Sequence, residues 1–304
     1  MVVLPGRRTR LLAFLVGLLI TEAVAALVCP DLERATKEID SGGFPGGLLW
    51  RIESDNGAEN YIFGTIHIAD SRVTQLDSSV ADALRSSPHF MMEVMLDIEA
   101  VQRMARAMHF TDGGSLSHLL DRDLFERAVE LLGRYGVTRE AANTLRPWAA
   151  YTTLSLPPGQ NAPPLDLLLM NEATATGKSA AGLETLDEQV AVFNSLSDEE
   201  QVELLTLTIC HYATFQSEVE EMITHYEARD LAAMMRMSVR YESALQDRFM
   251  DLLLRQRNFR MVDRMRPRLD AGGSFIAIGA LHLPGREGVL NLLQTAGYRV
   301  TRVF

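Results

Sequence analysis

YIFGTIH at Tyr61–His67 and FIAIGALH at Phe275–His282 are two apolar runs that each end in Gly-x-x-His. More than two hundred residues separate them. Each run predicts a buried strand that ends at a glycine, because glycine adopts a positive φ easily and lets another backbone approach closely. Since ligands of open α/β sheets bind beyond the carboxyl ends of the strands, His67 and His282 are candidates for one shared site. The alternative is a pair of unrelated core histidines, each bonded to a backbone carbonyl.

The remaining strand signals also lie toward the two ends of the chain. Leu48–Ile52 and Asn60–Phe63 flank an Asp-Asn-Gly turn at 55–57, which predicts a hairpin. His89–Val94 predicts a further buried strand. Weaker signals predict a short strand at 178–184, a helix at 288–296 and a terminal strand at 298–303.

Helical spacing dominates the part of the chain between these strands. Helices are expected at about 98–137, 165–176, 197–212 and 242–266. Pro267 is expected to end the last of them. The sequence therefore predicts an α/β fold, in which a mixed sheet is built from N- and C-terminal strands and carries a large helical insertion at about 97–270. Residues 26–47, which are rich in glycine near their end, are expected to form a flexible segment before a single domain at 48–304.

Two acidic residues lie where a carboxylate is costly to bury. Glu93 is part of the apolar segment 89–94, and such a group needs a cation or an ion-pair partner unless it faces solvent at the strand end. Glu184 follows the short apolar strand, and its alternative role is to place negative charge at the start of the helix near Asp187. Two histidines with one or two carboxylates form a donor set for Zn²⁺, Mn²⁺ or Co²⁺.

Arg257 and Asn258 lie late in a helix rich in leucine and methionine. On the inner face of that helix they would be able to orient a carboxylate or stabilise an oxyanion, although such an arginine is more often solvated. The sequence contains no His-Glu-x-x-His, no Gly-x-Ser-x-Gly, no P-loop and no Gly-x-Gly-x-x-Gly. The common zincin, α/β-hydrolase, nucleotide and dinucleotide sites therefore find no support. The other histidines have no partners at ligand spacing.

The N-terminus has the three parts of a secretory signal. Arginines at positions 7, 8 and 10 precede an apolar run at 11–20, and Ala-Val-Ala at 23–25 resembles a cleavage site. The apolar run is shorter than the ~20 residues that a membrane span needs. We therefore expect removal of residues 1–25 and a periplasmic or secreted protein. The alternative is an uncleaved signal that anchors the protein to the membrane.

The charge and the cysteines narrow the class of protein further. The net charge is −11, which argues against a nucleic-acid partner because phosphate binding needs clustered cations. Cys29 and Cys210 are the only cysteines. In an oxidising compartment they are candidates for a disulfide, with two free thiols as the alternative.

Several short motifs occur along the chain in a fixed order. They are Gly64-Thr65-Ile66-His67, Met92-Glu93-Val94, Arg146-Pro147-Trp148, Gly182–Gln189, Arg257-Asn258 and Ile278–Gly285. This ordered set resembles the TraB/GumN family, which also includes the Tiki metalloproteases of animals. The resemblance extends from about Leu48 to the C-terminus.

The resemblance implies a fold related to the erythromycin-esterase and haem-binding ChaN proteins. It also implies a metal-dependent hydrolase, with peptide cleavage supported by Mn²⁺ or Co²⁺ in the Tiki proteins. By position it assigns the metal to His67 and His282, with Glu93 as the matching acid. The motifs that contain Glu184 and Arg146 add two further candidates. The chain departs from the family pattern at Met95, where the family usually has a second acid; here Asp97 follows two residues later.

We therefore expect an exported, metal-dependent hydrolase that acts on a peptide or protein substrate. His67 and His282 would bind Mn²⁺, Co²⁺ or Zn²⁺, with Glu93 as ligand or base. Arg257 and Asn258 would polarise the scissile carbonyl or hold the substrate. Two non-catalytic alternatives remain: a protein of the ChaN type that binds haem or iron, and a protein that sequesters peptides.

Overall fold

The computed structural model describes residues 29–36, 40–160 and 162–304. The expected signal at residues 1–25 lies outside them. Within the described residues, no helix combines the length and the apolar character needed to cross a membrane.

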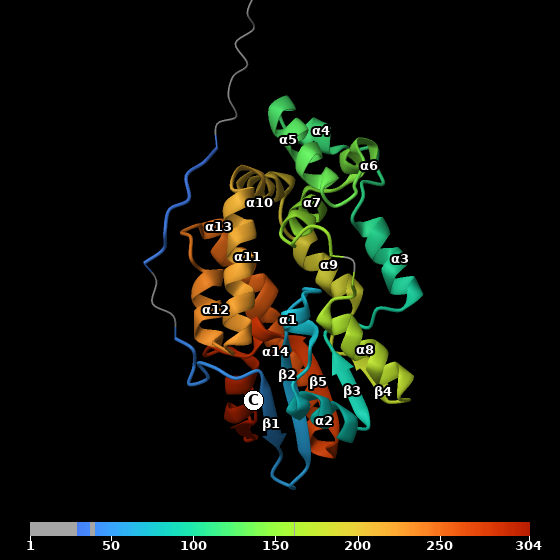
Figure 1. Ribbon diagram of the computed structural model, residues 1–304, viewed down its shortest axis with the longest axis vertical. Helices are drawn as coiled ribbons and strands as arrows, with labels where there is room; N and C mark the ends of the chain where they lie inside the picture. The colour runs from blue at the N-terminus through green and yellow to red at the C-terminus, as the bar shows by residue number, and fades with distance from the viewer. Residues whose placement is uncertain (1–28, 37–39, 161) are drawn as a thin grey trace, which may run out of the picture.

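One mixed sheet forms the centre of the protein (Figure 1). Its strands are β1 (Leu49–Glu53), β2 (Glu59–Thr65), β3 (His89–Met92), β4 (Ser179–Gly182), β5 (Ser274–Gly279) and β6 (Arg299–Arg302). Their order across the sheet is β4-β3-β5-β2-β1-β6. The first four strands in this order run parallel, whereas β1 pairs antiparallel with both β2 and β6. The predicted hairpin and the predicted N- and C-terminal strands are thereby confirmed, and so is the α/β fold class.

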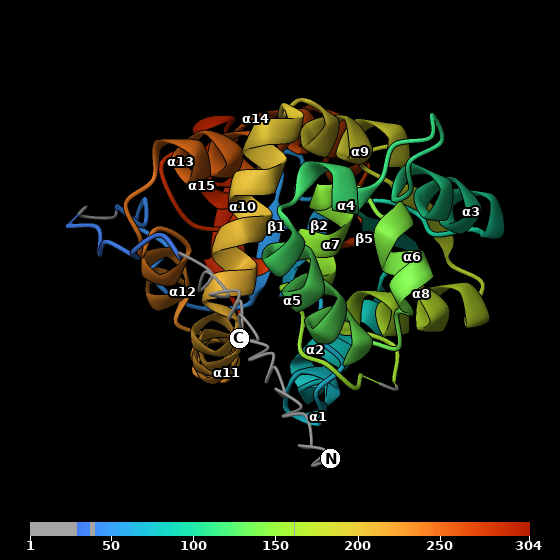
Figure 2. The ribbon, with the colours of Figure 1, turned by 90° about the horizontal axis from the view of Figure 1, so that it is seen from above.

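Helices cover both faces of this sheet (Figure 2). The helices near the sheet are α1 (Ser71–Thr74), α2 (Ser78–Ser86), α8 (Leu165–Ala175), α14 (Gln256–Ala271) and α15 (Val289–Thr295). In Figure 2, α14 and α15 lie on one side of the strands, and α1, α2 and α8 lie on the other. Helix α8 packs against β3, β4 and β5.

The remaining helices lie mainly beyond one end of the strands, in the upper part of Figure 1. They are α3 (Ile98–Ala107), α4 (Leu116–Leu119), α5 (Arg122–Gly133), α6 (Arg139–Thr144), α7 (Pro147–Leu154), α9 (Leu186–Asn194), α10 (Asp198–Cys210), α11 (Tyr212–Glu227), α12 (Leu231–Ser238) and α13 (Ala244–Met250). The chain between β3 and β5 is therefore mostly helical, as the sequence predicts, and β4 is its one strand among the described residues.

Two apolar clusters hold these layers together. The first lies around the sheet, where the rings of Phe90 and Phe275 stack with their centroids 6.4 Å apart. The second lies among α5, α7 and α10, and Leu131, Trp148 and Leu205 are buried in it. The helical insertion therefore has a buried apolar core of its own, separate from the core around the sheet.

The last long helix differs from the prediction. Instead of one helix at 242–266, the chain forms α13, a π-helical turn at Asp251–Arg255, and then α14. The prediction that Pro267 ends the helix is wrong, because α14 continues to Ala271. A proline inside a helix costs one hydrogen bond and about 3 kcal/mol. The burial of Met265 and Leu269, each 0% exposed, on either side of the proline offsets this cost.

Candidate functional site

The two Gly-x-x-His motifs follow neighbouring parallel strands. Gly64 of β2 pairs with Ile278 of β5, and Thr65 pairs with Gly279. On the other side of β5, Met92 of β3 pairs with Ala277, so that Glu93 follows the third strand at the same edge. The order β3-β5-β2 therefore brings His67, Glu93 and His282 to one edge of the sheet, as expected for the carboxyl ends of parallel strands.

Close packing explains the glycines of both motifs. Neither Gly64 nor Gly279 has a positive φ. A Cβ at Gly64 would lie 2.7 Å from Leu283 Cδ1 and 3.1 Å from the Cα of Ala280. A Cβ at Gly279 would lie 3.2 Å from Oε1 of Glu93. Of the two reasons that the sequence gives for these glycines, only the close approach of neighbouring groups applies.

Glu93 is a buried and ionised carboxylate, 8% exposed. The backbone N–H of Gly279 donates to its Oε1 at 2.7 Å, and Arg257 donates to its Oε2 at 2.5 Å. Burial alone would raise the pKa of Glu93, but the positive charges of Arg257 and His67 and the N–H of Gly279 outweigh it and hold that pKa well below its usual range. The solvent-facing alternative for Glu93 is therefore wrong.

His282 is fixed by an amide. Its Nδ1 lies 2.6 Å from Oδ1 of Asn258, while Nδ2 of Asn258 donates to the carbonyl of Glu287 at 2.8 Å. Because Nδ2 is the donor of this amide, Oδ1 accepts from His282, and the imidazole carries a proton on Nδ1. Burial lowers the pKa of His282 to about 4, so the ring is neutral near pH 7. Both polar ends of Asn258 therefore have a partner within the protein.

His67 is fixed by a carboxylate that sequence reasoning missed. Its Nδ1 lies 2.7 Å from Oδ2 of Asp166, whose Oδ1 accepts from the hydroxyl of Thr65. Asp166 raises the pKa of His67 to about 9, although the ring is 62% exposed and water weakens the interaction. The signal in the sequence was an acid inside the apolar run that opens α8, directly after Pro163 and Pro164.

An ion-pair network supports Glu93 from the side of α14. Arg257 donates through Nε to Glu184 at 2.8 Å and through Nη2 to Glu93. Arg260 donates to the other oxygen of Glu184 at 2.9 Å. The side chain of Gln189 donates to Glu93 at 3.2 Å. Glu184, whose side chain is 0% exposed, is thus an ion-pair partner of Arg257 and not a solvent-exposed acid at a helix start.

The structure leaves one sequence-predicted candidate outside this cluster. Arg146 precedes α7, and its guanidinium lies over the ring of Phe110 at 5.1 Å from the ring centroid. None of the contacts described for Arg146 reaches the residues of the site.

The candidate disulfide partners meet at a different place. Cys29 and Cys210 are joined, with their Cα atoms 5.6 Å apart. This bond ties the segment that begins at Cys29 to the end of α10.

A large cleft opens beside His67. Its volume is about 840 Å³, and its walls come from α10, α11, the loop between α12 and α13, and residues 30–33. His67, Ile66 and Ile68 form one part of its lining. The exposed imidazole of His67 is therefore part of the wall of this cleft.

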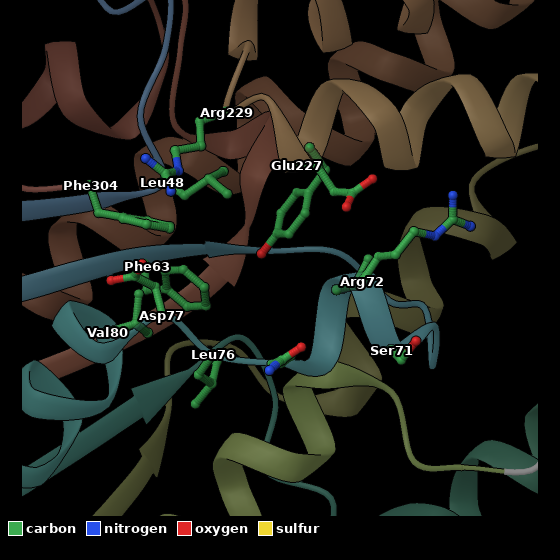
Figure 3. A pocket seen from close by; sticks show the side chains of 13 residues that line it. Leu48, Phe63, Ser71, Arg72, Leu76, Asp77, Val80, Glu227, Arg229 and Phe304 are labelled. Carbon is green, nitrogen blue, oxygen red and sulfur yellow. The ribbon is translucent and has the colours of Figure 1, made fainter.

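A second cavity, of about 490 Å³, lies between α1, α2 and the end of α11 (Figure 3). Figure 3 shows Arg229 beside Phe304, and the guanidinium of Arg229 lies 3.3 Å from the centroid of that ring. Arg72, at the other side of the cavity, is paired with Asp70 and Glu220. None of the site residues predicted from the sequence lines this cavity.

The donor atoms at the sheet edge fit a cation in kind and in orientation. Each histidine is held through Nδ1 by a second residue, which is how proteins orient imidazoles that bind metals through Nε2. Nε2 of His282 lies 3.6 Å from Oε1 of Glu93, so these two donor atoms are neighbours. Even so, no three His, Cys, Asp or Glu side chains in the described part of the chain are grouped closely enough to hold a metal ion.

Comparison with known proteins identifies the family of this chain. The model of the TraB/PrgY/gumN family matches residues 48–302. The chain is 25% identical to the metalloprotease TIKI2 of Danio rerio, over 89% of this chain and 64% of that protein. It is 24% identical to the metalloprotease TIKI1 of Homo sapiens, over 83% and 61% of the two chains.

A third relative, the metalloprotease TIKI2 of Xenopus tropicalis, is 24% identical over 96% of this chain and 66% of that protein. The chain thus spans less than two thirds of the length of these curated relatives. No solved structure matches the chain.

Proposed function

Because this chain belongs to the TraB/PrgY/gumN family, we propose that it is a metal-dependent hydrolase, and specifically a peptidase. The observation that carries the proposal is the meeting of His67, Glu93 and His282 at one end of the parallel strands, where Nε2 of His282 lies 3.6 Å from Oε1 of Glu93. Imidazole nitrogens and a carboxylate are donor groups that divalent metal ions bind. The relatives that are named metalloproteases support the reaction class.

Each residue of the cluster has a defined role in this proposal. His67 and His282 would hold a divalent ion through Nε2, with Glu93 as a third ligand or as the base. When bound, the ion lowers the pKa of a water molecule and polarises a carbonyl. Asp166 and Asn258 orient the two imidazoles, because they accept the Nδ1 protons.

Arg257 keeps Glu93 charged and fixed. Its guanidinium donates to Glu93 and to Glu184, and its charge helps to hold the pKa of the buried Glu93 below its usual range. A charged Glu93 is able to bind a cation or to accept a proton, whereas a protonated one is not.

We propose a peptide substrate and an exported protein for separate reasons. The cleft beside His67 has room for a chain of several residues, because its volume is about 840 Å³. The disulfide between Cys29 and Cys210 fits an oxidising compartment, such as the periplasm or the cell exterior. The signal-like sequence at residues 1–25 supports the same location.

A test of the metal site needs a binding measurement as well as an activity. Calorimetric titration of the chelator-treated protein with Mn²⁺, Co²⁺ and Zn²⁺ should give one site, which His282→Ala removes. His109→Ala is the matched control, because His109 bonds to Thr144 far from the cluster. Hydrolysis of a quenched fluorescent peptide library should stop with the chelator and return with the metal. Equal metal affinity in wild type and His282→Ala would contradict the proposal.

One observation favours a second candidate, a peptide-binding protein without turnover. Glu93 already accepts from Gly279, Arg257 and Gln189, which leaves little of the carboxylate free for a metal or a proton. Such a protein would bind peptides from the same library and release them intact, whether or not a metal is present. Mass spectrometry of the bound peptide distinguishes the two candidates.

A further inference from the structure

The cleft beside His67 has an apolar floor. Leu204 and Met237 are buried at its base, and Phe215, Val219, Met222 and Leu245 are partly buried along it. Side chains of this kind bury apolar groups of a ligand, at about 25 cal/mol for each Å² removed from water. The floor therefore offers affinity without selecting for charge.

The rim of the same cleft is acidic. Asp31, Glu33, Glu203 and Glu242 line it and are exposed. Within the described part of the chain, none of these four forms an ion pair with an arginine or lysine, and no arginine or lysine lines the cleft. Glu218 also lines it but is paired with Arg240.

Two of these acids are held in place by the N-terminal segment at 30–35, here called the strap. The disulfide at Cys29 fixes one end of the strap to α10, and Nε2 of His211 lies 2.7 Å from the carbonyl of Pro30. Further along, the N–H of Glu242 donates to the carbonyl of Glu33 at 2.9 Å. The acids of the strap are thus placed beside Glu242 before any ligand arrives.

Four exposed carboxylates line the opening, and no arginine or lysine lines it, so the negative potential there favours the approach of a cation. An anionic ligand, such as a phosphate or a fatty acid headgroup, would be repelled there. The combination of an apolar floor with an acidic rim therefore selects for ligands that are both apolar and positively charged.

We propose that the cleft binds extended peptide segments in which apolar side chains alternate with arginine or lysine. The apolar side chains lie on the floor, and the basic side chains reach the acids of the rim. His67 lines the cleft, so a segment bound in this way passes the metal site. This assignment rests on the proposed peptidase function only for the cleavage step, and not for the binding.

Binding of matched peptides tests the proposal without any turnover. Three fluorescent heptapeptides would share their apolar residues and carry arginine, glutamine or glutamate at the same two positions. Fluorescence anisotropy with the chelator-treated full chain should give the order arginine, glutamine, glutamate from tightest to weakest. The difference should shrink as the salt is raised from 20 to 500 mM, because exposed charges are screened.

Substitution of the rim acids locates the effect. Glu203→Gln with Glu242→Gln should weaken binding of the arginine peptide by about two- to fivefold for each acid at low salt, and should leave the glutamine peptide unchanged. The control is Glu172→Gln, which removes an exposed acid from α8 away from the cleft. Circular dichroism checks that each variant is folded.

The outcomes separate this inference from the proposed function. Equal affinity for the arginine and glutamate peptides, or an unchanged affinity in the double variant, overturns the inference even if metal-dependent cleavage is found. A clear preference for arginine without cleavage in the presence of metal supports the inference and contradicts the peptidase proposal.

Discussion

Replacement of Asp166 by asparagine should remove the carboxylate that holds Nδ1 of His67, while the shape of the side chain at position 166 stays the same. In the native protein, the carboxylate accepts from Thr65 and from Nδ1 of His67. In the variant, the amide loses the negative charge and keeps only one acceptor oxygen for its two partners. Where its NH₂ group faces Nδ1 of His67, the imidazole carries its proton on Nε2, the atom that we assign to the metal.

The size of the effect follows from the pKa of His67. Asp166 raises it from 6.5 to about 9, a change that would equal about 3 kcal/mol if the pair were buried. Because the ring is 62% exposed, solvent reduces this energy to about 1 kcal/mol or less, and we expect the pKa of His67 to fall toward 6.5 in the variant. Metal affinity should fall by about 10- to 100-fold, as for other residues that orient metal-binding histidines.

The sign of the pH dependence is also fixed. A histidine whose pKa is raised in the folded state stabilises the metal-free protein below pH 6.5, and the stabilisation is lost as the pH rises through about 9. Asp166→Asn should therefore lower the free energy of unfolding more at pH 6 than at pH 9.5. Metal binding to the native protein should release a proton near pH 7, since the ligand must be neutral.

Three measurements check this prediction. NMR titration of the His67 ring follows the pKa, urea unfolding at pH 6 and pH 9.5 follows stability, and calorimetry with Mn²⁺ in two buffers follows affinity and proton release. Glu172→Gln removes an exposed acid from the same helix and should change none of them. An Asp166→Asn variant with unchanged Mn²⁺ affinity and an unchanged His67 titration would refute the role of Asp166.

Two further changes test the packing around the site and a third tests the disulfide, and thermal unfolding measures each of them. Gly64→Ala should cost about 1–3 kcal/mol, because the new Cβ would lie 2.7 Å from Leu283, and a variant as stable as wild type would show that the strands have room there. Glu184→Ala should cost about 3–5 kcal/mol, since Arg257 would lose one of its two buried partners, whereas a loss below 1 kcal/mol would mean that the pair is solvated. Cys29→Ser should cost about 2–4 kcal/mol under oxidising conditions and nothing under reducing ones, where both proteins lack the bond; equal melting temperatures under oxidising conditions would contradict its formation.

Local signals in the sequence were sufficient for the sheet and for the meeting of the two motifs. Alternating and continuous apolar runs gave β1, β2, β3 and β5, because such runs depend on neighbours one or two residues away. The sequence analysis did not predict that β2 pairs with β5; it expected a shared site only from the general rule that ligands bind beyond the carboxyl ends of strands in α/β sheets.

The residues that contact the site residues could not be predicted from the sequence. Asp166 lies about a hundred positions from His67, and no local pattern connects them. The same holds for Glu184 and Arg257, which are 73 positions apart. Arg257 and Asn258 were expected to face a substrate, but the fold directs both toward other side chains of the protein.

Propensity misled the prediction at Pro267. A rule that ends helices at proline weighs one lost hydrogen bond, whereas the burial of Leu269 two residues later depends on how α14 packs in the finished protein. Close packing at Gly64 was equally hidden, since Leu283, the side chain that excludes a Cβ there, comes from the far end of the chain.

The central position of β5 in the sheet affects how the protein folds during its synthesis. This strand lies between β2 and β3, although more than two hundred residues separate Tyr61 from its partner Phe275. Until the ribosome has delivered the C-terminal residues, β2 and β3 each have an unpaired edge, and such edges invite aggregation. A nascent chain also holds only one of the two histidines. The site is therefore able to form only after β5 and His282 have been synthesised.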